Sequence, residues 1–192
     1  MSTSKTIKKI FENFGENFFS KNKPTILNKY EILENDPKDV IFAKNLNNSG
    51  GRFFYSDKED EIKNILKKLI THLKIDEIYC IDEKIKKKFS DINISLEPNS
   101  SQKNNGIILT CEHLIADQGK VLLSSSQIKN KKIDNFPGEI IVIAYISQIV
   151  LRINDAMRSI TKKYKTNSPF NISTIGSGKK KLSVIVVEDF EY

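Results

Sequence analysis

The chain has 192 residues, a formal net charge of +7 and 39% hydrophobic residues, a composition typical of a globular domain. No stretch approaches the ~20 consecutive apolar residues that a membrane span needs. The N-terminus carries neither an apolar signal core nor a small-residue cleavage site. We therefore expect a cytoplasmic protein.

The basic charge does not indicate a nucleic-acid partner. Arginine, the side chain best suited to bidentate contacts with phosphate and guanine, contributes only Arg52, Arg152 and Arg158 to the 31 basic residues. The lysines are spread over every segment and alternate with Glu, Asp and Asn, which is typical of a solvated surface. We expect no binding to nucleic acid.

The two cysteines, Cys80 and Cys111, exclude a cysteine-built metal framework in this chain. Neither belongs to a CxxC pair, and two cysteines cannot hold an iron–sulfur cluster. Both lie in apolar runs, which predicts reduced core residues rather than nucleophiles.

The N-terminal part is predicted to be a helix followed by an irregular arm. Apolar residues recur at helical spacing from Ile7 to Phe18. Residues 24–38 then lack a periodic pattern and end in the turn signal Asn35-Asp36-Pro37. We place the boundary so that residues 1–36 form this helix and arm and residues 37–192 form the main domain.

The middle of the chain alternates between predicted strands and helices. Val40–Ala43 and Phe53–Tyr55 are predicted strands, and Ser56 with Glu59 forms a capping box for a helix whose apolar face runs to Leu73. A short basic helix is predicted over residues 82–89. Further strands are predicted at 78–81, 92–96, 106–109, 114–116, 121–123 and 140–144.

The last part begins with a predicted long helix that starts at Ile146 and ends before Ser168-Pro169. Its expected apolar face contains Val150, Ile153, Met157, Ile160 and Tyr164. Final strands are predicted at 172–175 and 183–187. Residues 140–144 are continuously apolar and β-branched, as in a strand covered on both faces. The whole pattern predicts an open α/β sheet, mostly parallel and flanked by helices.

In open α/β sheets, ligands bind beyond the carboxyl ends of the strands. Polar residues that follow predicted strands are therefore the candidates for a site. They are Asp82, residues 110–113, 117–120 and 124–127, Tyr145, and residues 176–179.

The stretch "TCEHLIADQGKVLLSSSQ", residues 110–127, is the most unusual in the chain. Two apolar triplets flank Asp117-Gln118-Gly119-Lys120, and four residues with Asp first and Gly third suit a tight antiparallel reversal. Glu112-His113 before the reversal and Ser124-Ser125-Ser126 after it add more polar groups than a hairpin requires. We predict a reversal whose acid, Asp117, points into a cleft at the edge of the sheet.

The same stretch resembles the central signature of the LUD (lactate utilization) domain, the LutC/YkgG family. In "GIILTCEHLIADQGKVLLSSSQ", Ala116-Asp117-Gln118-Gly119 takes the place of an Ala-Glu-Thr-Gly turn. The segment "EIIVIAYISQIVLRINDAMRSI" is similar to the following strand and helix of the family. The resemblance implies a layered α/β fold of the NagB/RpiA/CoA-transferase type. It also implies a role, together with iron–sulfur partner proteins, in oxidising L-lactate to pyruvate.

The C-terminal signature departs from the family pattern. The element Gly-Pro-Ser-Arg-Thr-Ala-Asp-Ile has no counterpart, whereas "SGKKKLSVIVVED" resembles the Gly-rich turn and last strand, so that residues 182–187 complete the sheet. The resemblance therefore implies a short form that lacks the arginine of this element.

The sequence "GSGK" is not a phosphate-binding P-loop. Ser173 stands where the motif needs its first Gly, Lys180 replaces the hydroxyl residue, and a strand follows in place of a helix. A modest anion site remains open, built from the backbone N–H groups of Gly176-Ser177-Gly178 together with Lys179.

The resulting prediction is a LUD-domain protein connected with L-lactate oxidation, with Glu112, His113 and Asp117 as the catalytic candidates. His113 would be a general base oriented by one of the two acids. The predicted ligand-binding residues, for a small carboxylate or a cofactor, are Thr110, Gly119, Ser124, Ser125, Gly176, Ser177 and Lys179. No metal is expected.

Two alternatives stay open at this point. One is a CoA-transferase or sugar-phosphate-isomerase-like enzyme on the same fold, with Glu112 or Asp117 as its nucleophile or base. The other is a non-catalytic interaction module that docks to redox partner proteins.

Overall fold

The computed structural model describes residues 5–20, 30–95, 105–129, 131–165, 171–178 and 180–188. The α-helices in these ranges are α1 (Lys5–Phe19), α2 (Lys38–Asn48), α3 (Glu59–Leu73), α4 (Glu83–Lys88) and α5 (Ile153–Lys163). The strands are β1 (Arg52–Ser56), β2 (Glu77–Cys80), β3 (Ile94–Ser95), β4 (Asn105–Leu109), β5 (His113–Ile115), β6 (Lys120–Ser124), β7 (Glu139–Tyr145), β8 (Ile149–Val150), β9 (Ile172–Ile175) and β10 (Lys181–Val187). Short 3-10 helices are η1 (Ala116–Gln118), η2 (Ile133–Asn135) and η3 (Ile146–Gln148).

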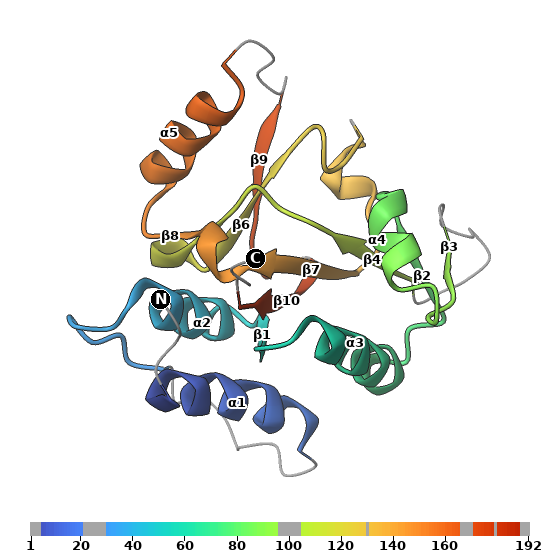
Figure 1. The fold of residues 1–192 in the computed structure, drawn as a ribbon, viewed down its shortest axis with the longest axis horizontal. Helices are drawn as coiled ribbons and strands as arrows, with labels where there is room; N and C mark the ends of the chain where they lie inside the picture. Colours follow the sequence, from blue (N-terminus) through green and yellow to red (C-terminus); the bar gives the residue numbers. More distant parts are fainter. Residues whose placement is uncertain are drawn as a thin grey trace.

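The larger sheet has six strands in the order β1-β10-β7-β4-β2-β3, and each neighbouring pair is parallel (Figure 1). This confirms the predicted fold class, a mostly parallel α/β sheet flanked by helices. β10 lies between β1 and β7, where Val184 is paired with Phe53 on one side and Val142 on the other. The expected completion of the sheet by residues 182–187 is therefore confirmed.

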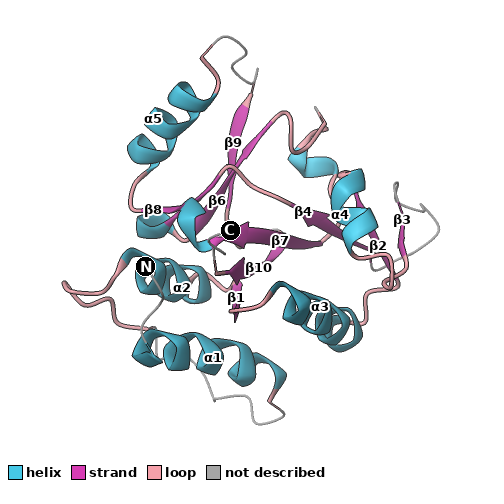
Figure 2. Ribbon diagram, viewed as in Figure 1, coloured by secondary structure: helices cyan, strands magenta, loops and turns pink. Residues whose placement is uncertain are grey.

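Alternation of side chains along the strands gives the larger sheet two apolar faces. In β7, Val142 and Ala144 face a core shared with α1, α2 and the smaller sheet, whereas Ile141 and Ile143 face α3 and α4. A continuously apolar strand is what two covered faces require. In the view of Figure 2, α1, α2 and α3 lie below the central strands and α5 lies above them.

The smaller sheet has the order β8-β5-β6-β9 and contains the reversal predicted from Asp117 and Gly119. β5 and β6 are antiparallel, β9 is antiparallel to β6, and β8 is parallel to β5. α5 covers the outer face of this sheet, where Ala156 and Ile160 pack against Ile115 and Leu122.

The predicted strand at Val40–Ala43 is wrong, because these residues belong to α2. The helix begins directly after Pro37, and its buried residues are Val40, Phe42, Ala43 and Leu46. Positions 42 and 46, like 40 and 43, lie one helical turn apart. The four consecutive apolar letters concealed this periodicity.

The predicted start of the long helix is also wrong. Residues 146–150 form η3 and β8, and α5 begins at Ile153 because β8 pairs with β5. Ile153 and Met157, expected on the buried face, are exposed, and Ala156 takes the inner position. The end predicted at Ser168-Pro169 falls outside the described residues, and α5 ends at Lys163.

The capping box predicted before α3 is replaced by a different arrangement. The helix begins at Glu59, but its N-cap residue Lys58 makes no side-chain cap. Instead, the Ser56 hydroxyl accepts a hydrogen bond from the Lys58 N–H at 3.3 Å and donates to the Lys58 carbonyl at 2.6 Å.

In the described ranges no helix is both long enough and apolar enough to traverse a bilayer.

The amino and carboxyl ends of the strands in the larger sheet differ in what surrounds them. At the amino edge, the Arg52 guanidinium donates to Glu139 at 2.8 Å and to the Ser183 hydroxyl at 3.0 Å, which joins β1, β7 and β10. At the carboxyl edge the chain leaves toward α4, the β5–β6 hairpin and η3. Loops therefore diverge at the carboxyl edge, where α/β sheets bind their ligands.

Candidate functional site

A cleft of about 720 Å³ opens at the carboxyl edge, beyond the ends of β2 and β4. These strands are neighbours, but the chain continues from β2 to β3 on one side and from β4 to β7 on the other. Such a reversal of direction is a topological switch point, the usual ligand position in this fold class. Polar residues that line the cleft include Thr110, Ser126, Gln127, Lys129, Lys163 and Tyr164.

Ammonium groups and carboxylates both line the cleft. Lys84, Lys129 and Lys163 line it, against the two acids Asp82 and Glu83. The Asp82 carboxylate is engaged in capping α4, because it accepts the N–H groups of Lys84 at 2.8 Å and of Ile85 at 3.4 Å. The cleft therefore offers lysine ammonium groups to which an anion can bind.

A buried carboxylate anchors one wall of the cleft. The Glu112 side chain is 1% exposed, and it accepts hydrogen bonds from Ser124 (2.8 Å), Gln127 (2.7 Å), Tyr164 (2.7 Å) and Lys163 (2.9 Å). We call these five residues the Glu112 cluster. Because every buried charge must be paired and hydrogen-bonded to be tolerated, the four donors explain why an acid can occupy this position.

The local fold brings the cluster together from two distant segments. Glu112 is fixed beside β6 because its N–H donates to the Leu122 carbonyl at 2.9 Å, and Ser124 ends the same strand. Lys163 and Tyr164 lie at the end of α5. The packing of α5 on the smaller sheet determines their position relative to Glu112. The ammonium of Lys163 also lies 4.9 Å from the centre of the Tyr164 ring, a cation–π contact.

The cluster shifts the titration of both charged partners. Burial alone would raise the pKa of Glu112, but the hydrogen bonds from Lys163, Tyr164, Ser124 and Gln127 outweigh it and hold that pKa below its usual value. The hydrogen bond to Glu112 raises the pKa of Lys163 above its usual value, against a smaller opposing effect of burial. Both groups are therefore charged at neutral pH and form an ion pair.

The structure divides five of the predicted site residues between the two ends of the β5–β6 hairpin. Thr110, Glu112 and Ser124 lie at the open end beside the cleft. Asp117 and Gly119 lie at the closed end. The length of β6, at ~3.3 Å per residue, puts roughly 13 Å between the two groups. The predicted gathering of Asp117 with the serines is not seen.

The closed end is a tight contact with α2. Gly119 has a φ of +59°, and a Cβ at this position would lie 2.5 Å from the Asn45 carbonyl carbon and the Leu46 nitrogen. Asn45 also donates its amide to the Ala116 carbonyl at 2.8 Å. Asp117 is exposed, and its backbone N–H donates to the Leu151 carbonyl at 3.0 Å.

The remaining predicted residues that the structure describes do not line the cleft. Gly176 lies against Lys120 at the closed end of the hairpin, and Ser177 approaches Gly50. Ser125 lines a separate hollow beside Ile128 and Asn171. The Nδ1 atom of His113 lies 3.2 Å from the carbonyl oxygen of Gln148. Lys179 lies outside the described residues.

The residues that the sequence did not single out are Lys163 and Tyr164. Tyr164 is expected only as part of an apolar face, and Lys163 lies in the basic last turn of α5. Asp82, Ser126 and Gln127, by contrast, belong to the polar groups that follow strands and could have been chosen on that signal.

Neither cysteine is arranged for catalysis or metal binding. Cys80 and Cys111 are free and buried. Burial raises the pKa of Cys80 to about 11 and also raises that of Cys111. Within the described ranges no group of three or more His, Cys, Asp or Glu side chains could hold a metal ion.

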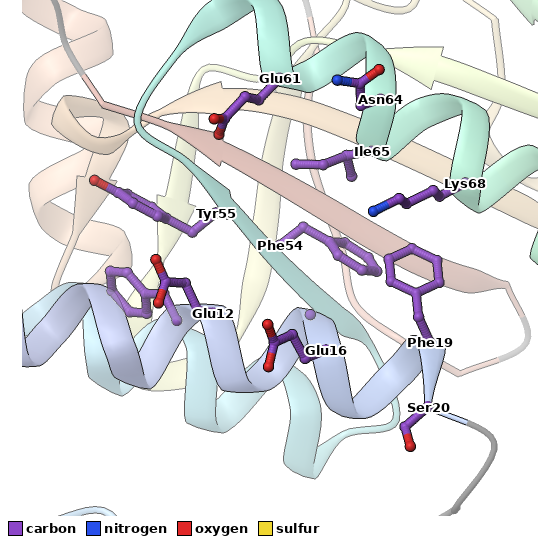
Figure 3. Close-up of a pocket in the computed structure, with 12 residues that line it drawn as sticks. Glu12, Glu16, Phe19, Ser20, Phe54, Tyr55, Glu61, Asn64, Ile65 and Lys68 are labelled. Carbon is purple, nitrogen blue, oxygen red and sulfur yellow. The ribbon is translucent and has the colours of Figure 1, made fainter.

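A second hollow, of about 630 Å³, lies between α1 and α3, with β1 at its base (Figure 3). Glu12 and Glu16 of α1 lie opposite Glu61 and Lys68 of α3, and Phe54 lies between the helices. These four charged side chains are exposed. The hollow has no counterpart to the buried Glu112 carboxylate among its described lining residues, so the cleft is the better candidate for a site.

Comparison with known proteins supports the fold. No known family profile matches the chain, and no curated protein matches it. Among solved structures, the chain is similar to a DUF162 family protein from Deinococcus radiodurans, with a TM-score of 0.60 and 14% sequence identity. The similarity covers 79% of this chain and 99% of that one. This chain therefore shares the α/β fold of that DUF162 family protein.

Proposed function

We propose that the chain is a LUD-type protein that binds a small carboxylate of the lactate and pyruvate class in the cleft beyond β2 and β4. DUF162 is the LUD domain, so the solved structure of similar fold and the resemblance of residues 106–187 support the same family. The observation that carries the proposal is the lysine-lined cleft at the switch point, with its wall anchored by buried Glu112.

The proposed binding mode follows from the donors in the cleft. Lys163 and Lys129 attract the carboxylate, and the hydroxyls of Thr110 and Ser126 can hydrogen-bond a 2-hydroxyl or 2-oxo group. An ammonium has three N–H donors, and the bonds of Lys163 to Glu112 and Tyr164 leave at least one for a ligand. Glu112 is then a positioning residue, which acts on the ligand through Lys163.

In this proposal the chain supplies the substrate site and an iron–sulfur partner protein accepts the electrons. Oxidation of L-lactate to pyruvate releases two electrons and two protons. Cys80 and Cys111 do not fit a cluster, because both are buried core residues on different segments. The electrons therefore pass to clusters held by the partner.

The geometry favours this proposal over a CoA-transferase mechanism. A carboxylate nucleophile must reach its substrate, whereas Glu112 is buried and accepts four hydrogen bonds. Asp117 is accessible but lies at the far end of the hairpin from the cleft. The catalytic roles of Glu112, His113 and Asp117 remain predictions.

Calorimetric titration with L-lactate and with pyruvate tests the proposal. Since a hydrogen bond to a charged group contributes about 1.5–3 kcal/mol, Lys163→Gln should weaken binding roughly tenfold or more. Lys162→Gln is the matched control, because Lys162 is exposed on the same helix and does not line the cleft. No binding of either acid, or equal weakening by the two variants, would refute the proposed site.

Co-purification of the tagged chain with cysteine-rich iron–sulfur proteins tests the proposed partner.

A further inference from the structure

A smaller cavity adjoins the cleft at Thr110, which lines both. Its volume is about 160 Å³. Thr110, Tyr145, Gln148 and Lys88 contribute polar groups to it. The rest of its lining is apolar and consists of Ile62, Ile85, Phe89, Ile143 and Val187.

This apolar cavity lies at the same edge of the sheet as the cleft. Thr110 follows β4, Tyr145 ends β7 and Val187 ends β10, so its floor is formed by carboxyl ends of adjacent strands. Ile62 of α3 and Ile85 of α4 cover it from the helical face. Thr110 therefore stands between a lysine-lined cleft and an apolar cavity.

The size of the cavity fits a definite chemical group. A dry apolar cavity of about 150 Å³ takes up benzene, so a cavity of about 160 Å³ can admit one phenyl ring or a branched alkyl chain. Lactate and pyruvate carry only a methyl group, which leaves such a cavity largely unfilled. Unfilled apolar walls forfeit the burial and dispersion energy that a larger substituent would gain.

We infer that the ligand of this site is a 2-hydroxy or 2-oxo acid whose side chain is a phenyl-sized apolar group, which occupies the cavity. This inference rests on the proposed function, because that proposal places the carboxylate in the cleft. The 2-substituent then lies at Thr110, between the carboxylate on one side and the apolar side chain on the other. Phenyllactate and 2-hydroxy-4-methylpentanoate represent the class.

Titration of the folded chain with L-lactate and with L-3-phenyllactate tests the inference. Burial of a phenyl ring should make phenyllactate bind roughly tenfold or more tighter than lactate. Ile85→Phe, at a half-buried position, fills the cavity and should reduce this affinity ratio to about one. Ile65→Phe is the matched control, since Ile65 is also half-buried but lines the hollow between α1 and α3, and it should keep the ratio.

Each outcome separates this inference from the proposed function. Lactate binding that depends on Lys163, without a preference for phenyllactate, overturns the inference and leaves the proposed function standing. No binding of either acid overturns both. A preference that survives Ile85→Phe places the apolar group elsewhere and also overturns the inference. If circular dichroism shows that Ile85→Phe is unfolded, Val187→Ile, which adds one methylene, repeats the test.

Discussion

At its open end the β5–β6 hairpin surrounds a buried carboxylate with four donors, whereas at its closed end it places a glycine against the backbone of α2. The open end depends on charge, because Glu112 would be costly there without Lys163 and its other partners. The closed end depends on shape, because Gly119 leaves no room for a Cβ. The ion pair at the open end can present a fixed ammonium to a ligand, whereas the steric contact at the closed end cannot. Chemical function is therefore expected at the open end.

The sharpest test of this difference compares the two acids of the hairpin. Glu112→Ala should lower the free energy of unfolding by about 2–4 kcal/mol, because it removes a buried charge and leaves its donors without an acceptor. Asp117→Ala should change it by less than about 0.5 kcal/mol, since Asp117 is an exposed side chain. Urea denaturation measures both. Equal losses of unfolding free energy in the two variants would contradict the conclusion that the open end depends on the charge of Glu112.

The closed end should be sensitive to volume. Gly119→Ala forces a side chain into the αL region and into the backbone of Asn45 and Leu46, so we expect a loss of about 1–3 kcal/mol. Gly138→Ala is the matched control, because a Cβ there meets no atom within 4 Å. Thermal unfolding of the two variants compares them. A Gly119→Ala protein as stable as the Gly138→Ala protein would show that the hairpin can move away from α2.

The stability that Glu112 contributes at the open end should also depend on pH. The hydrogen bonds that overcome the cost of burial hold the pKa of Glu112 below its unfolded value. Its stabilisation is therefore complete above the unfolded pKa and is lost as the pH falls through the lower, folded pKa. Between about pH 7 and pH 3, Glu112→Gln should lose less stability than the unchanged protein. The same decline in both proteins would mean that Glu112 contributes little to acid unfolding.

Much of the fold could be predicted because strand and helix periodicities are local. The β-branched run at 140–144 indicated a doubly covered strand, and β7 is one. The strand predicted at 40–43 was wrong because four consecutive apolar residues fit both a strand and one buried helical turn. The distinguishing signals lay outside the run, in Pro37 before it and in the buried Leu46 after it.

The candidate site could be predicted only where it follows a strand. Glu112 and Ser124 share one short hairpin, so the quoted stretch contains both. Lys163 and Tyr164 join them across an interval of about 40–50 residues, at a position set by the packing of Ala156 and Ile160 on the smaller sheet. Sequence periodicity indicates that a helix has an apolar face, but it does not fix where the end of that helix will lie.

The placement of β10 between β1 and β7 determines the order in which the molecule can be assembled. Arg52 and Ser183, paired across β1 and β10, are separated by 131 residues in the chain. Contacts between such distant residues slow folding, because a long loop must close before they gain any energy. A nascent polypeptide stalled before Lys181 would leave the flanks of β1 and β7 without their shared neighbour. These two strands would then be open to pairing with other chains until translation delivers the missing one.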